Sequence, residues 1–283
     1  MRRRNLLGLA GLCLASILAV VSLRQRDGGW GPPSTATHLA QLHADVFFLN
    51  VPEIVQRGPP RLVVVRLEGP AQLVPHHYLQ AGLGAPQTIE AWAEHLGAPV
   101  VFNGGQFDDR LQYLGWLKAD NVWLSPQRKP GWMGLLVSGP LDGGAWGRIV
   151  DLEQADANVV RRYRHVLQSM MLVDDAKRIR VRNSERAACR TVVAEDRQGR
   201  LLVLATEGAV TLKSLAAWLP RSGLGVVRAM NLDGGIESQL AIDTPELRMA
   251  LYGQYGTEAH VLEAHGPMVR YPLPVVVAVQ PAR

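Results

Sequence analysis

The stretch TVVAEDRQGRLLVLA, residues 191–205, gives the clearest secondary-structure prediction in this sequence. Two mostly apolar runs, residues 191–195 and 201–205, flank a polar turn that ends in Gly199. Two such runs joined by a short turn with a glycine predict a β-hairpin. Antiparallel strand pairing is therefore part of the fold, and the segments on either side of the hairpin determine its class.

Further strands and two helices are predicted around this hairpin. Five other runs predict strands, at residues 61–67, 99–102, 132–137, 226–232 and 271–279. Residues 88–96 and 211–219 carry apolar side chains at helical spacing, and each begins with a threonine that can cap the first turn. Hairpins mixed with scattered helices indicate an α+β fold, with helices flanking a mixed, largely antiparallel sheet.

The N-terminus has the pattern of a segment that enters a membrane. Arg2, Arg3 and Arg4 precede a mostly apolar run at residues 6–23, and Arg24 follows it. A positive flank before about 18 apolar residues fits a signal peptide or a signal-anchor helix. Because the positive flank stays in the cytoplasm, we expect a periplasmic or other extracytoplasmic protein, anchored in the inner membrane by residues 6–23.

Changes in composition predict where the folded part begins. Residues 1–26 form the signal peptide or anchor, and residues 27–37, rich in Gly, Pro, Ser and Thr, form a linker. Residues 38–283 are long enough for one sizeable core but short for two. We therefore expect a single domain over residues 38–283.

The composition narrows the class of partner without choosing one. The formal net charge is +5, which favours anionic partners such as nucleic acid, lipid headgroups or phosphorylated glycans. The segment 161–190 is rich in Arg, but Asp174, Asp175 and Glu185 interrupt it and no aromatic residues alternate with the charges. We therefore expect no nucleic-acid binding. Cys189 is the one cysteine in the predicted domain, so an intramolecular disulfide is excluded there.

Several common catalytic motifs are missing from the sequence. It has no Gly-rich phosphate loop ending in Lys-Ser/Thr, no nucleophile elbow and no dinucleotide fingerprint. His76 and His77 are adjacent and diverge, and His260 and His265 do not share a helical face. We therefore expect neither a cofactor nor a bound metal.

Two predicted strands end in a polar side chain followed by two glycines. These are VVFNGGQFDD at residues 100–109 and AMNLDGGIESQL at residues 229–240. Paired glycines let the backbone turn sharply and let a ligand approach main-chain N–H groups. Each motif alone is better explained as an ordinary tight turn, in which Asn or Asp bonds the local backbone.

In combination, however, these motifs resemble the phosphodiester glycosidase family. The resemblance rests on NGGxF at residues 103–107, CRTVVAEDRQGRLLVLATEG at 189–208, TLKSLAAWL at 211–219 and NLDGG at 231–235. Their order and spacing match the family from about residue 100 to about residue 240. The sequence departs from the family pattern at Gln106, Ile236 and Glu237, where an aromatic residue, a small residue and a hydroxyl residue are usual.

The resemblance implies hydrolysis of a sugar-1-phosphodiester, or a related envelope glycan linkage, at the anomeric carbon. Asp233 is the expected base or nucleophile, Arg190 the expected phosphate clamp, Asn103 a hydrogen-bonding partner of sugar or phosphate, and Glu237 a candidate second carboxylate. The expected substrate-binding residues are Gly104, Gly105, Asp108, Gln168, Thr191, Gly234 and Gly235. A phosphate is a stabilised leaving group, so general-acid help is less necessary than in an ordinary glycosidase.

Two other functions stay open from the sequence. A non-catalytic envelope glycan-binding or assembly protein of the same fold would also explain Ile236 and Glu237. A metal-dependent phosphodiesterase would use Asp108, Asp109 and Asp233. The glycosidase hypothesis requires Asn103, Arg190 and Asp233 to meet around a common cleft.

Overall fold

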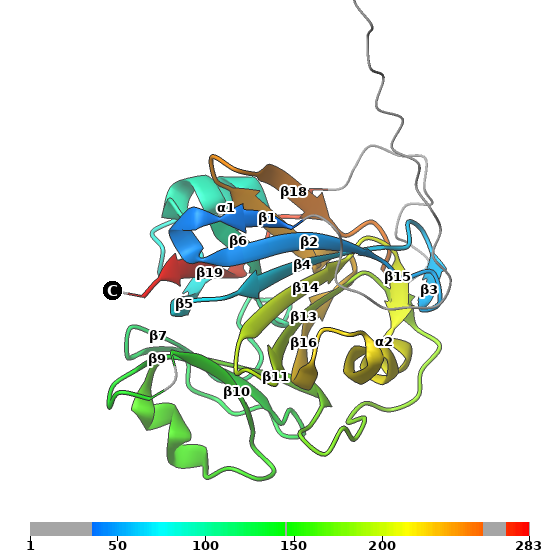
Figure 1. The fold of residues 1–283 in the computed structure, drawn as a ribbon. Coiled ribbons are helices and arrows are strands. Elements are labelled where there is room, and N and C mark those ends of the chain that lie inside the picture. Colours follow the sequence, from blue (N-terminus) through cyan, green and yellow to red (C-terminus); the bar gives the residue numbers. More distant parts are fainter. Residues whose placement is uncertain (1–35, 145, 257–269, 283) are drawn as a thin grey trace, which may run out of the picture. The chain divides into compact units, whose positions relative to one another are not determined.

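The computed structural model describes residues 36–144, 146–256 and 270–282, and strands dominate this part of the chain (Figure 1). It contains nineteen strands but only two α-helices, α1 (Ile89–Leu96) and α2 (Leu212–Trp218). The predicted α+β class is therefore wrong, and the described chain is mainly β. The reason is that each helix spans only about two turns, while most other segments pair as short strands with distant partners.

The largest sheet has eleven strands. In order across the sheet they are β1 (Thr37–Leu39), β2 (Ala44–Asn50), β4 (Arg61–Leu67), β14 (Leu201–Thr206), β13 (Arg190–Asp196), β16 (Val226–Gly234), β11 (Tyr163–Val173), β7 (Leu117–Ala119) and β8 (Val122–Ser125). Two further strands, β9 (Gly134–Pro140) and β10 (Gly147–Asp151), join through β11. The predicted hairpin is confirmed as β13 and β14, which pair in register from Thr191 with Ala205 to Glu195 with Leu201.

Two smaller sheets complete the described chain. A five-stranded sheet runs β18 (Arg248–Tyr252), β17 (Gln239–Asp243), β6 (Val100–Asn103), β19 (Val275–Pro281) and β5 (Ala71–His77). A three-stranded sheet runs β12 (Ala187–Ala188), β15 (Ala209–Thr211) and β3 (Val55–Arg57). Four short 3₁₀ helices are η1 (Ala40–Leu42), η2 (Ala157–Arg162), η3 (Leu219–Arg221) and η4 (Gly235–Glu237). All strand pairings among the described residues are antiparallel.

The two larger sheets share one apolar core. Val193 and Met230 of the eleven-stranded sheet pack in the same cluster as Phe102 and Val277 of the five-stranded sheet. Successive side chains of a strand point to opposite faces, so the alternate residues of β13 and β14 pack with α2 on the other face. Helix α1 covers the second face of the five-stranded sheet, where Trp92 is fully buried.

Both predicted helices are confirmed, together with their caps. Thr88 Oγ1 accepts a hydrogen bond from the Ala91 N–H at 3.4 Å at the start of α1, and Gly97 ends this helix in the left-handed conformation. Thr211 Oγ1 accepts from the Ser214 N–H at 3.0 Å at the start of α2. The caps work because they satisfy N–H groups that have no partner inside the helix.

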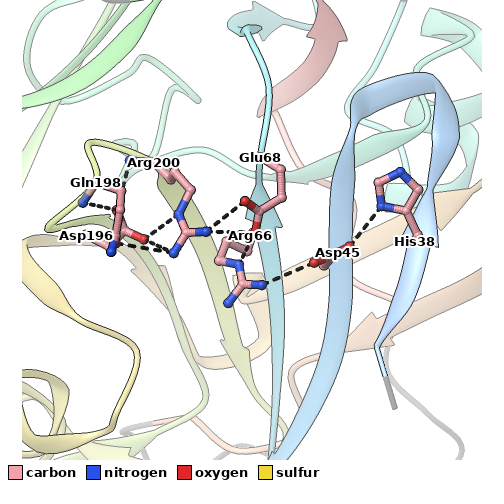
Figure 2. Close-up of polar contacts among 7 residues, drawn as sticks. All are labelled: His38, Asp45, Arg66, Glu68, Asp196, Gln198 and Arg200. Carbon is pink, nitrogen blue, oxygen red and sulfur yellow. Dashed lines mark hydrogen bonds and ion pairs between the residues drawn. The ribbon is translucent and has the colours of Figure 1, made fainter. Parts of the chain in front are cut away.

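A line of polar contacts crosses the ends of several strands in the eleven-stranded sheet (Figure 2). This charge ladder consists of His38, Asp45, Arg66, Glu68, Asp196, Gln198 and Arg200. Arg66 lies directly opposite Asp45 in register and contacts its Oδ2 at 3.1 Å, and Arg200 contacts Glu68 at 2.7 Å. Acidic and basic side chains alternate along the ladder, so each charge faces an opposite one.

The predicted N-terminal membrane segment lies outside the described residues, as does most of the predicted linker. The first strand begins at Thr37, one residue before the predicted start of the domain. Within the described residues, no helix combines the length and the apolar character needed to cross a membrane.

Candidate active site

The site lies where the chain passes from one sheet to another. Strand β16 belongs to the eleven-stranded sheet, and β17, which follows it after η4, belongs to the five-stranded sheet. Strand β17 pairs with β6, so the end of β6 is brought beside the end of β16. The two glycine corners, residues 103–105 and 233–235, therefore meet at the junction of the two sheets.

Asn103 and Asp233 hold the two corners together. Asn103 Nδ2 donates to the Asp233 carbonyl oxygen at 3.1 Å, and the Asp233 N–H donates to the Gly104 carbonyl oxygen at 3.1 Å. The other end of the Asn103 amide, Oδ1, accepts from the Gln239 N–H at 3.1 Å. Asn103 is only 1% exposed. The amide of Asn103 thus contacts Asp233 and cross-links the strands that form the two corners.

The glycines are required because the backbone is approached closely at both corners. A Cβ atom at Gly104 would lie 2.7 Å from Val275 Cγ1, and one at Gly234 would lie 2.8 Å from the Cys189 carbonyl oxygen. Gly235 has a φ of 79°, which side-chain-bearing residues rarely adopt. The N–H groups of Gly104 and Gly235 donate to the carbonyls of Val275 and Cys189 at 2.9 Å. These two donors are therefore used inside the protein, where the sequence predicted ligand contacts.

Arg190 lies at the start of β13, directly across from Gly234. Its side chain is held by two backbone carbonyls: Nε donates to Val210 at 3.2 Å and Nη2 donates to Arg186 at 3.0 Å. Its third nitrogen, Nη1, lies 2.9 Å from the point where a Cβ of Gly234 would be. The guanidinium is thus fixed in place, with one edge turned towards the second glycine corner.

Arg190 remains a cation at neutral pH although it is buried. Burial lowers the pKa of Arg190 to about 10, and the Cys189 thiol and the Asp233 carboxylate oppose this effect. A pKa of about 10 leaves the guanidinium charged at pH 7. The site therefore holds a permanent positive charge within electrostatic reach of Asp233.

Asp233 and Glu237 form a pair of carboxyl groups with raised proton affinity. Burial raises the pKa of Asp233 to about 7, and the charge of Glu237 adds to this, against the Gly234 N–H and Arg190. The Gly234 N–H donates to Asp233 Oδ1 at 2.9 Å. Burial also raises the pKa of Glu237. Burial and the charge of Glu237 therefore both favour the protonated form of Asp233.

Tyr113 is a buried neighbour of Asp233 that the sequence alone does not reveal. Burial and then the charge of Asp233 raise the pKa of Tyr113 well above its usual value. Its hydroxyl donates to the Gln168 carbonyl oxygen at 2.7 Å. A Cβ at Gly105 would collide with this hydroxyl, so the first glycine corner also leaves space for the phenol.

Tyr271 is a second tyrosine near the carboxyl pair. Burial and then the charges of Glu237 and Asp233 raise the pKa of Tyr271. The Tyr271 carbonyl oxygen accepts from Gln239 Nε2 at 2.8 Å, which ties this residue to the start of β17. Neither tyrosine lies in a recognisable motif, so no local signal in the sequence points to them.

Gln168 supports the loops beside the site. Its Oε1 accepts from the N–H groups of Trp116 and Lys129 at 3.1 and 3.0 Å. Its Nε2 donates to the carbonyls of Lys129 and Trp132 at 3.0 and 2.7 Å. The side chain is fully buried, and both ends of its amide are occupied. Its contacts are those of a residue that positions loops.

Thr191 and Asp108, two predicted substrate-binding residues, form hydrogen bonds within the protein. Thr191 Oγ1 and Ser238 Oγ are hydrogen-bonded at 2.8 Å, which links β13 to the turn that carries Glu237. Asp108 Oδ1 accepts from the N–H groups of Arg110 and Gln112, both at 2.9 Å. Thr191 is therefore tied to the carboxyl pair, whereas Asp108 closes its own loop.

Comparisons with known proteins give the family of the chain and related folds. The family model of the phosphodiester glycosidases matches residues 97–266, more than half of the 283-residue chain. The fold is similar to that of the zebrafish N-acetylglucosamine-1-phosphodiester alpha-N-acetylglucosaminidase catalytic domain, with a TM-score of 0.59, 15% identity, and coverage of 84% of this chain and 83% of that one.

A hypothetical protein from Synechocystis is also similar in fold. It has a TM-score of 0.52 and 15% identity, with coverage of 83% of this chain and 61% of that one. No curated protein matches the sequence significantly. The family match spans both glycine corners, Arg190 and the β13–β14 hairpin. The chain therefore belongs to the phosphodiester glycosidase family.

Proposed function

We propose that the protein hydrolyses a sugar-1-phosphodiester at the bond between the anomeric carbon and the phosphate oxygen. The products are a free sugar and a phosphomonoester. The observation that carries the proposal is the meeting of Asp233, Glu237 and the buried cation Arg190 at one junction of two sheets. Membership of the family supports the class of reaction.

Asp233 is the proposed base. A group with a pKa near 7 is suited to accept a proton at neutral pH, because it is ionised in part and still basic. In this step the oxygen of a water molecule bonds to the anomeric carbon while the bond from that carbon to the phosphate oxygen breaks. The electron pair leaves with the phosphomonoester, and the proton of the water passes to Asp233.

Arg190 is proposed to bind the phosphate by one edge. The resemblance implied a phosphate clamp, but Nε and Nη2 are already bonded to backbone carbonyls. Nη1 lies on the side of the second glycine corner, and we assign it to one phosphate oxygen. A fixed cation stabilises the charge that develops on a departing phosphate without having to reorganise.

Glu237 is the residue that most separates this chain from the family pattern, and we propose two consequences for it. Burial raises the pKa of Asp233 and the charge of Glu237 raises it further, which favours a base that works near neutrality. The bulk of Glu237, where the family usually has a hydroxyl residue, reshapes the sugar pocket. The same substitution also favours the second candidate, a non-catalytic glycan-binding protein of this fold.

Sugar release tests the proposal. The full chain is incubated with a panel of sugar-1-phosphodiesters that includes N-acetylglucosamine-1-phosphate esters, and free sugar is measured. We expect release by the wild type and none by Asp233→Asn. Asp243→Asn is the matched control, because Asp243 is an exposed aspartate at the end of β17, and it should retain activity. Glycan binding without release from any ester would favour the non-catalytic candidate.

We also propose that the site works outside the cytoplasm. The support is the sequence pattern of Arg2 to Arg4 followed by the apolar residues 6–23. Alkaline phosphatase fused after the last residue should be active in bacterial cells, because this reporter folds only after export. Activity that persists after deletion of residues 1–26 would contradict the proposal.

A further inference from the structure

A groove of about 460 Å³ opens on the α2 side of the eleven-stranded sheet. Its apolar lining includes Trp132, Met133, Met170 and Leu212, and its polar lining includes Arg182 and Ser184. This volume lies within the range of about 300–1,000 Å³ that is usual for small-molecule sites. Neither the family match nor the proposed chemistry assigns a role to it.

The segments that line one side of the groove also hold the guanidinium of Arg190. The two carbonyls that hold this guanidinium belong to Arg186 and Val210. Each lies two residues along the chain from a residue that lines the groove: Ser184 precedes Arg186, and Leu212 follows Val210. The same backbone segments therefore hold the cation and form one side of the groove.

The floor of the groove lies on the strand next to Asp233. Met170 of β11 is directly opposite Asn231 of β16, which is two residues before Asp233. Two residues span about 7 Å along a strand, so the groove begins within the length of one small ligand from the carboxyl pair. The loop that carries Trp132 is held by Gln168, whose carbonyl accepts from Tyr113 beside Asp233.

The lining indicates what the groove accepts. Half-buried Trp132, Met133, Met170 and Leu212 present apolar surface, and flexible thioethers adapt to chains of different shape. Arg182 is exposed and forms no ion pair within the described part of the chain, so it adds positive charge at the mouth. Arg180, in contrast, is committed to Asp151, Glu153 and Asp174.

We propose that this groove is the binding site for an apolar aglycone, the group on the far side of the phosphate from the sugar. The phosphate would lie at Arg190, the sugar at the carboxyl pair, and an alkyl or aryl group along Met170, Trp132 and Leu212. This assignment rests on the proposed role of Arg190 in phosphate binding. It names a substrate class, a sugar-1-phosphate ester of an apolar alcohol.

Binding of alkyl phosphates tests the groove without requiring turnover. Calorimetry compares octyl phosphate with methyl phosphate on the full chain. The wild type should bind octyl phosphate at least about tenfold more tightly, because the groove buries several additional methylene groups. Met170→Gln should reduce this ratio, whereas the matched control Met249→Gln should leave it unchanged, because Met249 lies on β18 of the other large sheet.

The outcomes separate the groove from the proposed function. Equal binding of the two phosphates, or a ratio that Met170→Gln does not change, overturns the groove assignment even if sugar is released from simple esters. Preferential octyl binding that Met170→Gln weakens supports the assignment even if no ester is hydrolysed, in which case the proposed hydrolysis alone fails.

Discussion

Two groups of charged side chains lie at strand ends in this protein, and they have opposite surroundings. In the charge ladder, Asp45 contacts both His38 and Arg66, and Glu68 contacts both Arg66 and Arg200 (Figure 2). At the carboxyl pair, Asp233 forms no direct ion pair within the described residues, and Arg190 acts on it only through its charge.

This difference decides the proton affinity of each group. The hydrogen bond from His38, with further help from Arg66, lowers the pKa of Asp45. Burial raises the pKa of Asp233 to about 7, with Glu237 as the second cause. The same residue type is thus a permanent anion in one place and a neutral-range acid or base in the other. Carboxyl groups without an adjacent cation are therefore the ones to examine for chemistry.

The largest difference in activity is expected between a variant at Arg190 and a variant at Arg66. Arg190→Ala should lower kcat/KM by about 10²–10³, as is typical when a fixed group that stabilises transition-state charge is removed. Arg66→Ala should leave kcat/KM unchanged, because the ion pairs that the described residues form with Arg66 are with Asp45 and Glu68 of the charge ladder. Urea unfolding of both variants separates catalysis from folding. Equal losses of activity in the two variants would contradict the distinction.

A second test uses the dependence of stability on pH. The pKa of Asp233 is about 7 in the folded protein, against 3.8 for an ordinary aspartate, so the folded state holds its proton more tightly. Its stabilising contribution is complete below pH 3.8, falls as the pH rises and is lost above about pH 7.

The side-chain amide of the Asp233→Asn variant does not titrate, so the variant does not lose this stability as the pH rises. Relative to the wild type, we expect the variant to gain roughly 4 kcal/mol of stability between pH 4 and pH 8.5, because each unit of pKa shift corresponds to about 1.4 kcal/mol. Urea denaturation at several pH values measures it. A constant difference between the two proteins across this range would show that Asp233 does not have a raised pKa.

Glu237→Gln tests whether the two carboxyl groups are coupled. The charge of Glu237 raises the pKa of Asp233, so its removal should lower that pKa. If ionised Asp233 is the base, the acidic limb of the pH–rate profile should move to lower pH. The profile of kcat/KM between pH 4 and 9 measures this shift, and Asp243→Asn serves as the control. An acidic limb that does not move would show that the charge of Glu237 does not affect the pKa of Asp233.

The smallest effect is expected in the charge ladder. Asp45→Asn should lower the free energy of unfolding by about 0.2–1 kcal/mol at pH 7, because the pair with Arg66 is partly exposed. Since the folded pKa of Asp45 is lowered, its contribution exists above pH 3.8 and is lost as the pH falls below that value. Unfolding at pH 7 and pH 3 measures this. A larger destabilisation by Asp45→Asn at pH 3 than at pH 7 would contradict the prediction.

Local elements of this fold follow well from sequence. The hairpin at residues 191–205 and the helix at residues 88–96 depend on short-range patterns, and both are present. The fold class does not follow in the same way. Short strands such as β3 and β15 have only three residues, and they pair with each other although they lie far apart in the chain, so no local period marks them.

At the site, too, some features follow from the sequence and others do not. The two glycine corners could be recognised from their strand-end position, and the structure brings Asn103 and Asp233 into contact. Tyr113 and Tyr271 could not be recognised, because their closeness to Asp233 results from loop packing. The backbone bonds of Arg190 were also invisible, since carbonyl acceptors carry no sequence signal.

The position of bond cleavage tests the central claim most directly. A sugar-1-phosphodiester is hydrolysed by the full chain in water enriched in ¹⁸O, and both products are analysed by mass spectrometry. Attack at the anomeric carbon at this site predicts ¹⁸O in the free sugar and none in the phosphomonoester. Label in the phosphomonoester would mean attack at phosphorus, and would contradict the glycosidase mechanism.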